Sequence, residues 1–106
     1  MATKQDFVDF IIDQIRNQDK IRYKKMFGDY AIYYDNKVVA LCCDNKLYIK
    51  PLASNIDIIG KENLVEAKPF EGSKNWFLIE EEIENSELIQ ELFESTSKNL
   101  PLKNQK

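Results

Sequence analysis

The sequence predicts an α+β fold of two layers, in which an antiparallel meander sheet carries an N-terminal and a C-terminal helix packed on it. Between residues 26 and 50, three apolar runs are separated by two copies of the turn sequence Asp-Asn-Lys. Asp and Asn tolerate the positive φ that tight hairpin turns require, so this repeat predicts two consecutive β-hairpins. Apolar residues at helical spacing near both ends of the chain predict the two helices.

A helix is expected over about Lys4–Asn17. Phe7, Phe10, Ile11 and Ile15 recur there at the spacing of one helical face. A helix with a single apolar face must lie on another layer, and the meander is the large candidate for that layer.

The meander is expected to consist of three strands, over Tyr30–Tyr34, Val38–Cys43 and Leu47–Lys50. A strand over Arg22–Phe27 is expected to enter the sheet before them. Gly28 and Asp29 interrupt the first pair of strands and indicate a bulge or a turn. Pro51 ends the meander, because proline cannot donate a hydrogen bond to a neighbouring strand.

The second half of the chain is expected to hold a short helix over Ala53–Gly60, a loop over residues 61–73, a strand over Asn75–Glu80 and a helix that ends near Ser97. Asn85 or Ser86 can cap this last helix, and its apolar residues again recur at helical spacing. We therefore expect one domain over residues 1–98, followed by a flexible C-terminal tail over residues 99–106.

Two-residue turns at positions 35–36 and 44–45 would determine which side chains share each face of the meander, because directly opposed residues lie on the same face. One face would then be apolar, with small residues at its centre, and would carry a helix. It consists of Ala31, Tyr33, Val38, Ala40, Cys42, Leu47 and Ile49. The opposite face is our candidate interaction face, and its residues are Tyr30, Ile32, Tyr34, Val39, Leu41 and Tyr48.

The candidate interaction face needs a cover, because its tyrosines and aliphatic residues would otherwise form a large exposed apolar patch. Another part of the chain, such as the final helix, could cover it, as could a second copy in a homodimer, a ligand or a foreign protein partner. A three-residue turn would instead shift the strand register by one residue and exchange the two faces.

Basic and aromatic residues occur together at the start of the meander, where Arg22, Lys24 and Lys25 stand beside Phe27 and Tyr30. Such clusters can hold phosphates and stacked bases, so these three cations are our candidate nucleic-acid contact. Strand alternation, however, places Arg22 and Lys24 on the face opposite to Lys25, and lysines on an edge strand also serve to prevent aggregation. Because the chain has a net charge of −3 and a pI near 5.0, nucleic acid is not the expected partner.

The sequence offers no catalytic or metal-binding constellation, and we expect no catalytic residue, no metal site and no cofactor. The chain contains no histidine, which excludes Ser-His and Cys-His nucleophile pairs. Cys42 and Cys43 are adjacent and would point to opposite faces of a strand, where buried thiols are expected. The acidic run at residues 80–84 is expected to be a solvated loop.

Apolar runs in this chain are all shorter than the roughly 18 residues needed to span a bilayer, so we expect no membrane partner. The N-terminus carries Asp6 and Asp9 within a helical pattern, which is not typical of a signal peptide. The expected compartment is therefore the cytoplasm.

Four short segments resemble a known family, and they are KMFG at residues 25–28, YAIY at 30–33, AL at 40–41 and LYIK at 47–50. They are similar to the N-terminal domain of the TfoX/Sxy competence regulators, although Asp29 stands where that family often has a second glycine. The resemblance extends over nearly the whole chain. It implies a two-layer α+β fold and membership of a transcription-linked family.

Together with the missing catalytic constellation, this resemblance favours a stand-alone, non-enzymatic domain that acts by contact with a protein partner. The identity of that partner is not indicated by the residues, and a homodimer is one of the open alternatives. The second interpretation is a regulator that contacts nucleic acid directly through Arg22, Lys24 and Lys25.

Overall fold

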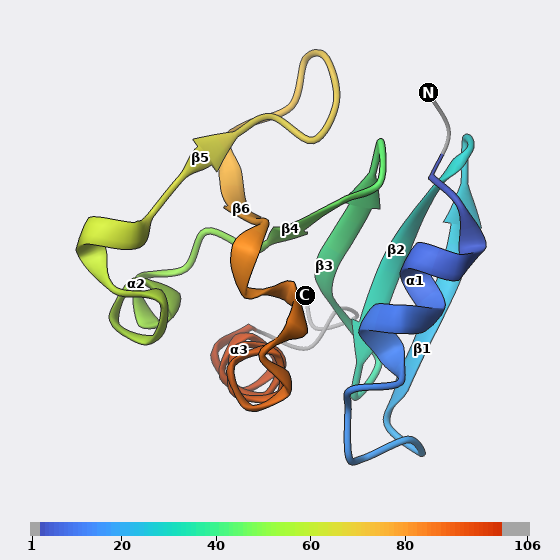
Figure 1. Ribbon diagram of the computed structural model, residues 1–106, viewed down its shortest axis with the longest axis horizontal. Coiled ribbons are helices and arrows are strands. Elements are labelled where there is room, and N and C mark those ends of the chain that lie inside the picture. The colour runs from blue at the N-terminus through green and yellow to red at the C-terminus, as the bar shows by residue number, and fades with distance from the viewer. Residues whose placement is uncertain (1–2, 101–106) are drawn as a thin grey trace, which may run out of the picture.

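The computed structural model describes residues 3–100 and confirms the predicted α+β fold (Figure 1). Its elements, in chain order, are α1 (Gln5–Ile12), β1 (Ile21–Met26), β2 (Asp29–Tyr34), β3 (Lys37–Cys43), β4 (Lys46–Ile49), α2 (Ala53–Ile59), the 3-10 turn η1 (Lys61–Asn63), β5 (Glu66–Ala67), β6 (Trp76–Ile79), the 3-10 turn η2 (Glu81–Glu84) and α3 (Ser86–Asn99). Asn99, in the predicted tail, is the last residue of α3. Residues 101–106 of that tail lie outside the described residues.

The strands form one antiparallel sheet in the order β1-β2-β3-β4-β6-β5. β5 occupies two residues of the segment that we expected to be a loop, and it pairs with β6 through Glu66 opposite Phe77 and Ala67 opposite Trp76. Figure 1 shows the β1–β2 turn, the β3–β4 turn and the loop between β5 and β6 at the same end of the molecule.

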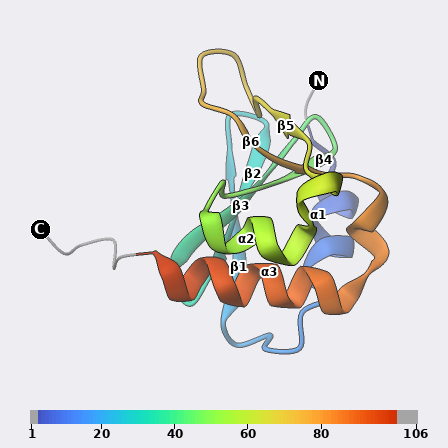
Figure 2. The same ribbon diagram turned by 90° about the vertical axis from the view of Figure 1, so that its left-hand side faces the viewer.

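The helices of the described chain pack on one face of this sheet. α1 lies across β1 and β2 (Figure 1), and α2 and α3 lie side by side (Figure 2). The core between these helices and the sheet contains Val8 and Ile11 from α1, Ile59 from α2, and Leu92 and Phe93 from α3, all of them buried.

The opposite face of the sheet carries a second, smaller apolar cluster that consists of strand residues. We call it the helix-free face, and its residues are Ala31, Tyr33, Val38, Leu41, Cys43, Tyr48, Ala67, Trp76 and Leu78. Ala31, Leu41, Cys43 and Tyr48 are nevertheless buried, because the side chains of neighbouring strands surround them.

The two Asp-Asn turns form as the sequence predicts. All four of their residues have φ between 54° and 68°, in the left-handed region that these turns require. The β3–β4 register is also confirmed, with Leu41 opposite Tyr48 and Cys42 opposite Leu47.

A β-bulge between β2 and β3 changes the predicted faces. Tyr33 lies opposite Val38, but the residue that precedes it in β2, Ile32, lies opposite Ala40, so that Val39 is an extra residue in β3. Val39 and Ala40 both belong to the helix-side core. Because side chains alternate along a strand, one extra residue moves the side chains paired beyond it to the other face of the sheet.

The predicted candidate interaction face is therefore wrong as a single surface. Four of its residues lie in the core beneath the helices, namely Tyr30, Ile32, Tyr34 and Val39. Leu41 and Tyr48 lie on the helix-free face, as do Ala31, Tyr33 and Val38, which we had placed beneath a helix. Both faces of the sheet are apolar, as predicted, but each face receives the β2 side chains that we had assigned to the other face.

α1 is shorter than expected and ends at Ile12, although Ile15 remains buried. The helix ends there because side chains form hydrogen bonds with backbone N–H and carbonyl groups that a longer helix would pair with one another. Gln18 donates its side-chain N–H groups to the carbonyls of Ile12 and Ile15, and the backbone N–H of Arg16 donates to Gln90 of α3. This segment is thereby attached to α3 instead of extending the helix.

Candidate functional site

The turn between β1 and β2 combines backbone strain with an exposed aromatic ring. Met26 lies opposite Asp29, so Phe27 and Gly28 form a two-residue hairpin turn, with φ of 52° and 86°. Turns of this kind favour Asn-Gly or Asp-Gly, and a bulky L-residue in the left-handed region costs roughly 1–2 kcal/mol. The Phe27 side chain is fully exposed and contributes no packing that would offset this cost.

Two further exposed apolar residues, Met26 and Phe70, surround an apolar pocket beside this turn. The pocket has a volume of about 390 Å³. We call it the hairpin pocket, and it is lined by Met26, Phe27, Asp29, Tyr30, Leu41, Cys43 and Phe70. Leu41 and Cys43 come from the helix-free face, so the pocket opens at the end of that face where the turns gather.

Hydrogen bonds from the N-terminal segment hold the hairpin turn in place. The backbone N–H of Thr3 donates to the carbonyl of Gly28 over 3.0 Å, and the Thr3 hydroxyl lies 2.8 Å from Asp29 Oδ1. The N–H of Asn45 donates to the Thr3 hydroxyl, and the N–H of Lys4 donates to Asn45 Oδ1. The β1–β2 and β3–β4 turns are therefore joined through Thr3, which fixes the position of Phe27.

The two cysteines are buried thiols, as expected, and they lie on opposite faces of β3. Burial raises the pKa of Cys42 to about 12, and burial together with the nearby Asp29 carboxylate raises the pKa of Cys43 to about 11. Both thiols are therefore protonated at neutral pH. Cys43, although it lines the hairpin pocket, is not an activated nucleophile there.

These thiols should make the protein less stable in alkali. Their folded pKa values are raised above the value of 9.0 for a free thiol, so their stabilising contribution is complete below pH 9 and is lost as the pH rises towards 11–12. For Cys42, the free energy of unfolding is expected to fall by about 1.4 kcal/mol per pH unit in this window. Urea unfolding at pH 9, 10 and 11 measures this slope, and a Cys42→Ala variant with the same slope as the wild type would refute the prediction.

The structure separates the three residues of the predicted nucleic-acid contact. Arg22 and Lys24 pair opposite Tyr33 and Ala31 on the helix-free face, while Lys25 pairs opposite Tyr30 on the helix face. The Arg22 guanidinium lies 5.7 Å from the centroid of the Tyr33 ring and donates to Asn36 Oδ1 over 2.8 Å. A shallow groove of about 310 Å³ is lined by Arg22, Tyr23, Lys24 and Tyr33.

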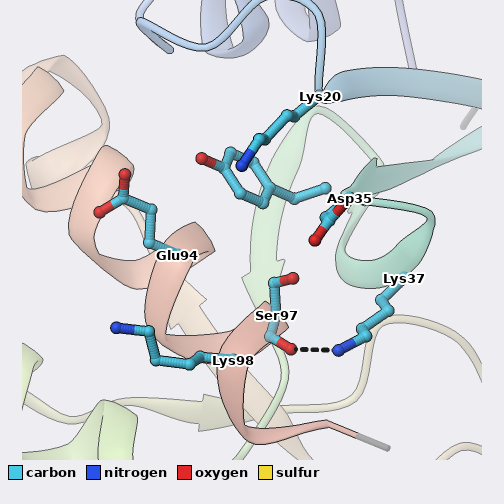
Figure 3. Close-up of a pocket in the computed structure, with 7 residues that line it drawn as sticks. Lys20, Asp35, Lys37, Glu94, Ser97 and Lys98 are labelled. Carbon is cyan, nitrogen blue, oxygen red and sulfur yellow. Dashed lines mark hydrogen bonds between the residues drawn. The ribbon is translucent and has the colours of Figure 1, made fainter. Parts of the chain in front are cut away.

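A larger pocket, of about 490 Å³, lies where the β2–β3 turn meets the end of α3 (Figure 3). Its side chains carry both signs of charge, and it is lined by Lys20, Tyr34, Asp35, Lys37, Glu94, Ser97 and Lys98. Lys37 Nζ donates to the carbonyls of Ser97, over 2.8 Å, and Leu100, over 3.0 Å. These carbonyls end a helix, where a cation is favourable, so the contact fastens α3 to the sheet.

Within residues 3–100, no group of three or more Cys, Asp or Glu side chains is arranged to hold a metal ion. The acidic segment that we expected to be a loop forms the 3-10 turn η2. Among the same residues, no helix is both long enough and apolar enough to cross a bilayer.

Phe27 and Phe70 are the site residues that sequence reasoning missed. A signal for Phe27 was present, because Phe-Gly stands between two strands where a tight turn favours Asn-Gly. Phe70 gave no comparable signal, since its place beside the hairpin depends on how the loop between β5 and β6 folds back.

Comparison with known proteins agrees with the resemblance seen in the sequence. The model of the TfoX N-terminal domain matches residues 13–99. The chain is also similar to a protein of Spirochaeta aurantia described as the uncharacterized 12.7 kDa protein in the trpE 5′ region, with 33% identity over 101 residues, which are 95% of this chain and 86% of the relative. The chain belongs to the TfoX N-terminal domain family.

Proposed function

We propose that the protein is a non-enzymatic regulatory module of the cytoplasm, linked to competence or transcription, which acts through protein–protein contact at the hairpin pocket. The observation that carries this proposal is Phe27, whose ring is fully exposed at a backbone position where a bulky residue is strained. Strain of this kind is concentrated at functional sites, because the surrounding structure must hold it in place.

The surroundings of Phe27 fit a protein interface. Exposed Met26 and Phe70 flank a pocket of about 390 Å³ whose floor includes Leu41. Aromatic residues and methionine are enriched at protein interfaces, and the residues that dominate binding energy usually occupy such desolvated pockets. Family membership supports the regulatory role, since the family is named for a competence regulator.

Direct contact with nucleic acid is the second candidate function. The groove that Arg22, Tyr23, Lys24 and Tyr33 line favours it, because cations next to aromatic rings can hold phosphates and stacked bases. Two observations weigh against it. Lys25 lies on the other face of the sheet, and Arg22 is already engaged by Asn36 and Tyr33.

A capture experiment tests the first function. Tagged wild-type protein is expected to retain partner chains from a lysate of its source cells. The amount retained by Phe27→Asn is expected to be at least about tenfold smaller, since the loss of one aromatic anchor at the centre of an interface has an effect of this size. Phe10→Asn, which changes an exposed phenylalanine on α1, is the matched control and should retain them fully.

Equal capture by wild type and Phe27→Asn would refute the hairpin pocket as the site. Titration with DNA separates the second function, because phosphate binding must weaken steeply as salt rises and should be reduced by Lys24→Ala. Apolar contact at the hairpin pocket predicts capture that depends little on salt.

A further inference from the structure

We propose that the hairpin pocket of one protein chain receives Phe27 of a second copy, in a two-fold symmetric dimer. This inference rests on the proposed function and names the first occupant of the same site. Its starting point is that a projecting ring and an apolar pocket lie side by side on one surface, since Phe27 itself stands at the edge of the pocket. A two-fold interface requires a patch that is complementary to itself, and an adjacent projection and recess satisfy this requirement.

The size and lining of the pocket fit a phenyl ring. A cavity of roughly 150 Å³ is sufficient to bind benzene, and the hairpin pocket measures about 390 Å³. Leu41, Cys43 and Tyr30 line it, and the Cys43 thiol is uncharged at neutral pH. An incoming aromatic side chain would therefore exchange water for apolar and sulfur contacts.

Charge indicates a second copy as the occupant. Among the described residues that line the pocket, Asp29 is the charged one. The strand that delivers Phe27 carries Lys24 and Lys25 just before it, one on each face of the sheet, and both lysines are exposed. The hairpin of a second copy thus presents cations to a recess that contains a carboxylate, whereas an acidic partner segment would be repelled by Asp29.

The other obvious route to a dimer is less favourable. β1 is an edge strand, and two copies could pair their β1 strands to extend the sheet. That arrangement would place Arg22, Lys24 and Lys25 of one strand against the same cations of the other, and like charges opposite each other destabilise a sheet. The charges on the β1 edge therefore disfavour this route to a dimer.

The hairpin turn prepares Phe27 for this role. Its left-handed backbone and the hydrogen bonds through Thr3 fix the turn before any partner arrives. A side chain that is already held in position loses less entropy when it binds, which strengthens association.

Sedimentation of purified protein over a micromolar to millimolar range tests self-association. The wild type is expected to show a concentration-dependent monomer–dimer equilibrium, and Phe27→Asn should weaken it about 100-fold or more, because the change removes both inserted rings of a symmetric dimer. Phe10→Asn should leave the equilibrium unchanged. A wild type that is monomeric throughout the range overturns the dimer, and Phe27-dependent capture of a foreign chain would then still uphold the proposed function.

Isotope-filtered NMR on a mixture of labelled and unlabelled wild-type protein tests the insertion itself. At a concentration at which the protein sediments as a dimer, the Phe27 ring of one copy should show contacts with the Leu41 methyl groups of the other. The Phe27→Asn variant is the control and should show no intermolecular contact. A dimer in which the two Phe27 rings contact each other and not Leu41 would show that the two turns meet tip to tip, which overturns insertion into the pocket, as would a dimer without any contact from Phe27.

Discussion

Ile32→Lys is expected to unfold the protein, whereas Tyr33→Lys, one residue further along β2, should leave it folded. Ile32 is fully buried in the core beneath the helices, while Tyr33 is half-buried on the helix-free face. An unpaired ammonium group in an apolar core costs several kcal/mol, which is a large part of the 5–15 kcal/mol that stabilises a typical domain. At Tyr33 the longer lysine side chain can reach water, so a loss of about 1 kcal/mol is expected.

Circular dichroism and urea unfolding of the two variants provide the measurement. The comparison is sharp because the faces predicted without the bulge have the opposite consequence, with Tyr33 beneath a helix and Ile32 facing a partner. A folded Ile32→Lys and an unfolded Tyr33→Lys would show that Val39 is not bulged. With the bulge, a double Ile32→Lys and Leu41→Lys variant is expected to unfold and not to yield a folded monomer.

The two predicted Asp-Asn turns are confirmed, because the residue types within each turn determine its conformation. Asp35-Asn36 and Asp44-Asn45 carry the positive φ that their residue types favour, and the β3–β4 register follows from the second turn alone. The bulge at Val39 could not be inferred in the same way. Val38, Val39 and Ala40 are all apolar, so no alternation of polar and apolar residues marks which of them is the extra one.

The end of α1 was missed for a different physical reason. The apolar spacing continues to Ile15, and periodicity alone therefore extends the helix. The structure ends it at Ile12, since Gln90, a buried residue 74 positions after Arg16, accepts the backbone N–H of Arg16. Interactions between residues so distant in the chain override local preference, and a single sequence does not reveal them.

The candidate site was predictable in part. Family membership and the presence of a second apolar sheet face follow from residues 26–50, although several residues were assigned to the wrong face. The hairpin pocket depends on three segments that meet only after folding. Those segments are the β1–β2 turn, β3 and the loop that carries Phe70. For the nucleic-acid candidate, strand alternation in the sequence already placed Lys25 on the face opposite to Arg22, and the structure has them on opposite faces.

Phe27→Asn is expected to make the isolated monomer more stable while it removes the binding surface. Asparagine is among the preferred residues for a two-residue turn before glycine, so the variant should relieve strain of about 1 kcal/mol at a φ of 52°. The exposed ring makes little packing contact within one chain, and its loss should cost little. For a domain of this size, the gain corresponds to a rise of several degrees in the melting temperature.

In the function that we propose, Phe27 is held in an unfavourable conformation for binding and not for folding. The most direct test of this claim is the melting temperature of Phe27→Asn beside that of the wild type, measured at low micromolar concentration so that association contributes little. We predict a higher melting temperature for the variant, as expected when a functional site stores strain. A melting temperature several degrees below that of the wild type would show that Phe27 stabilises the monomer, and it would contradict the claim.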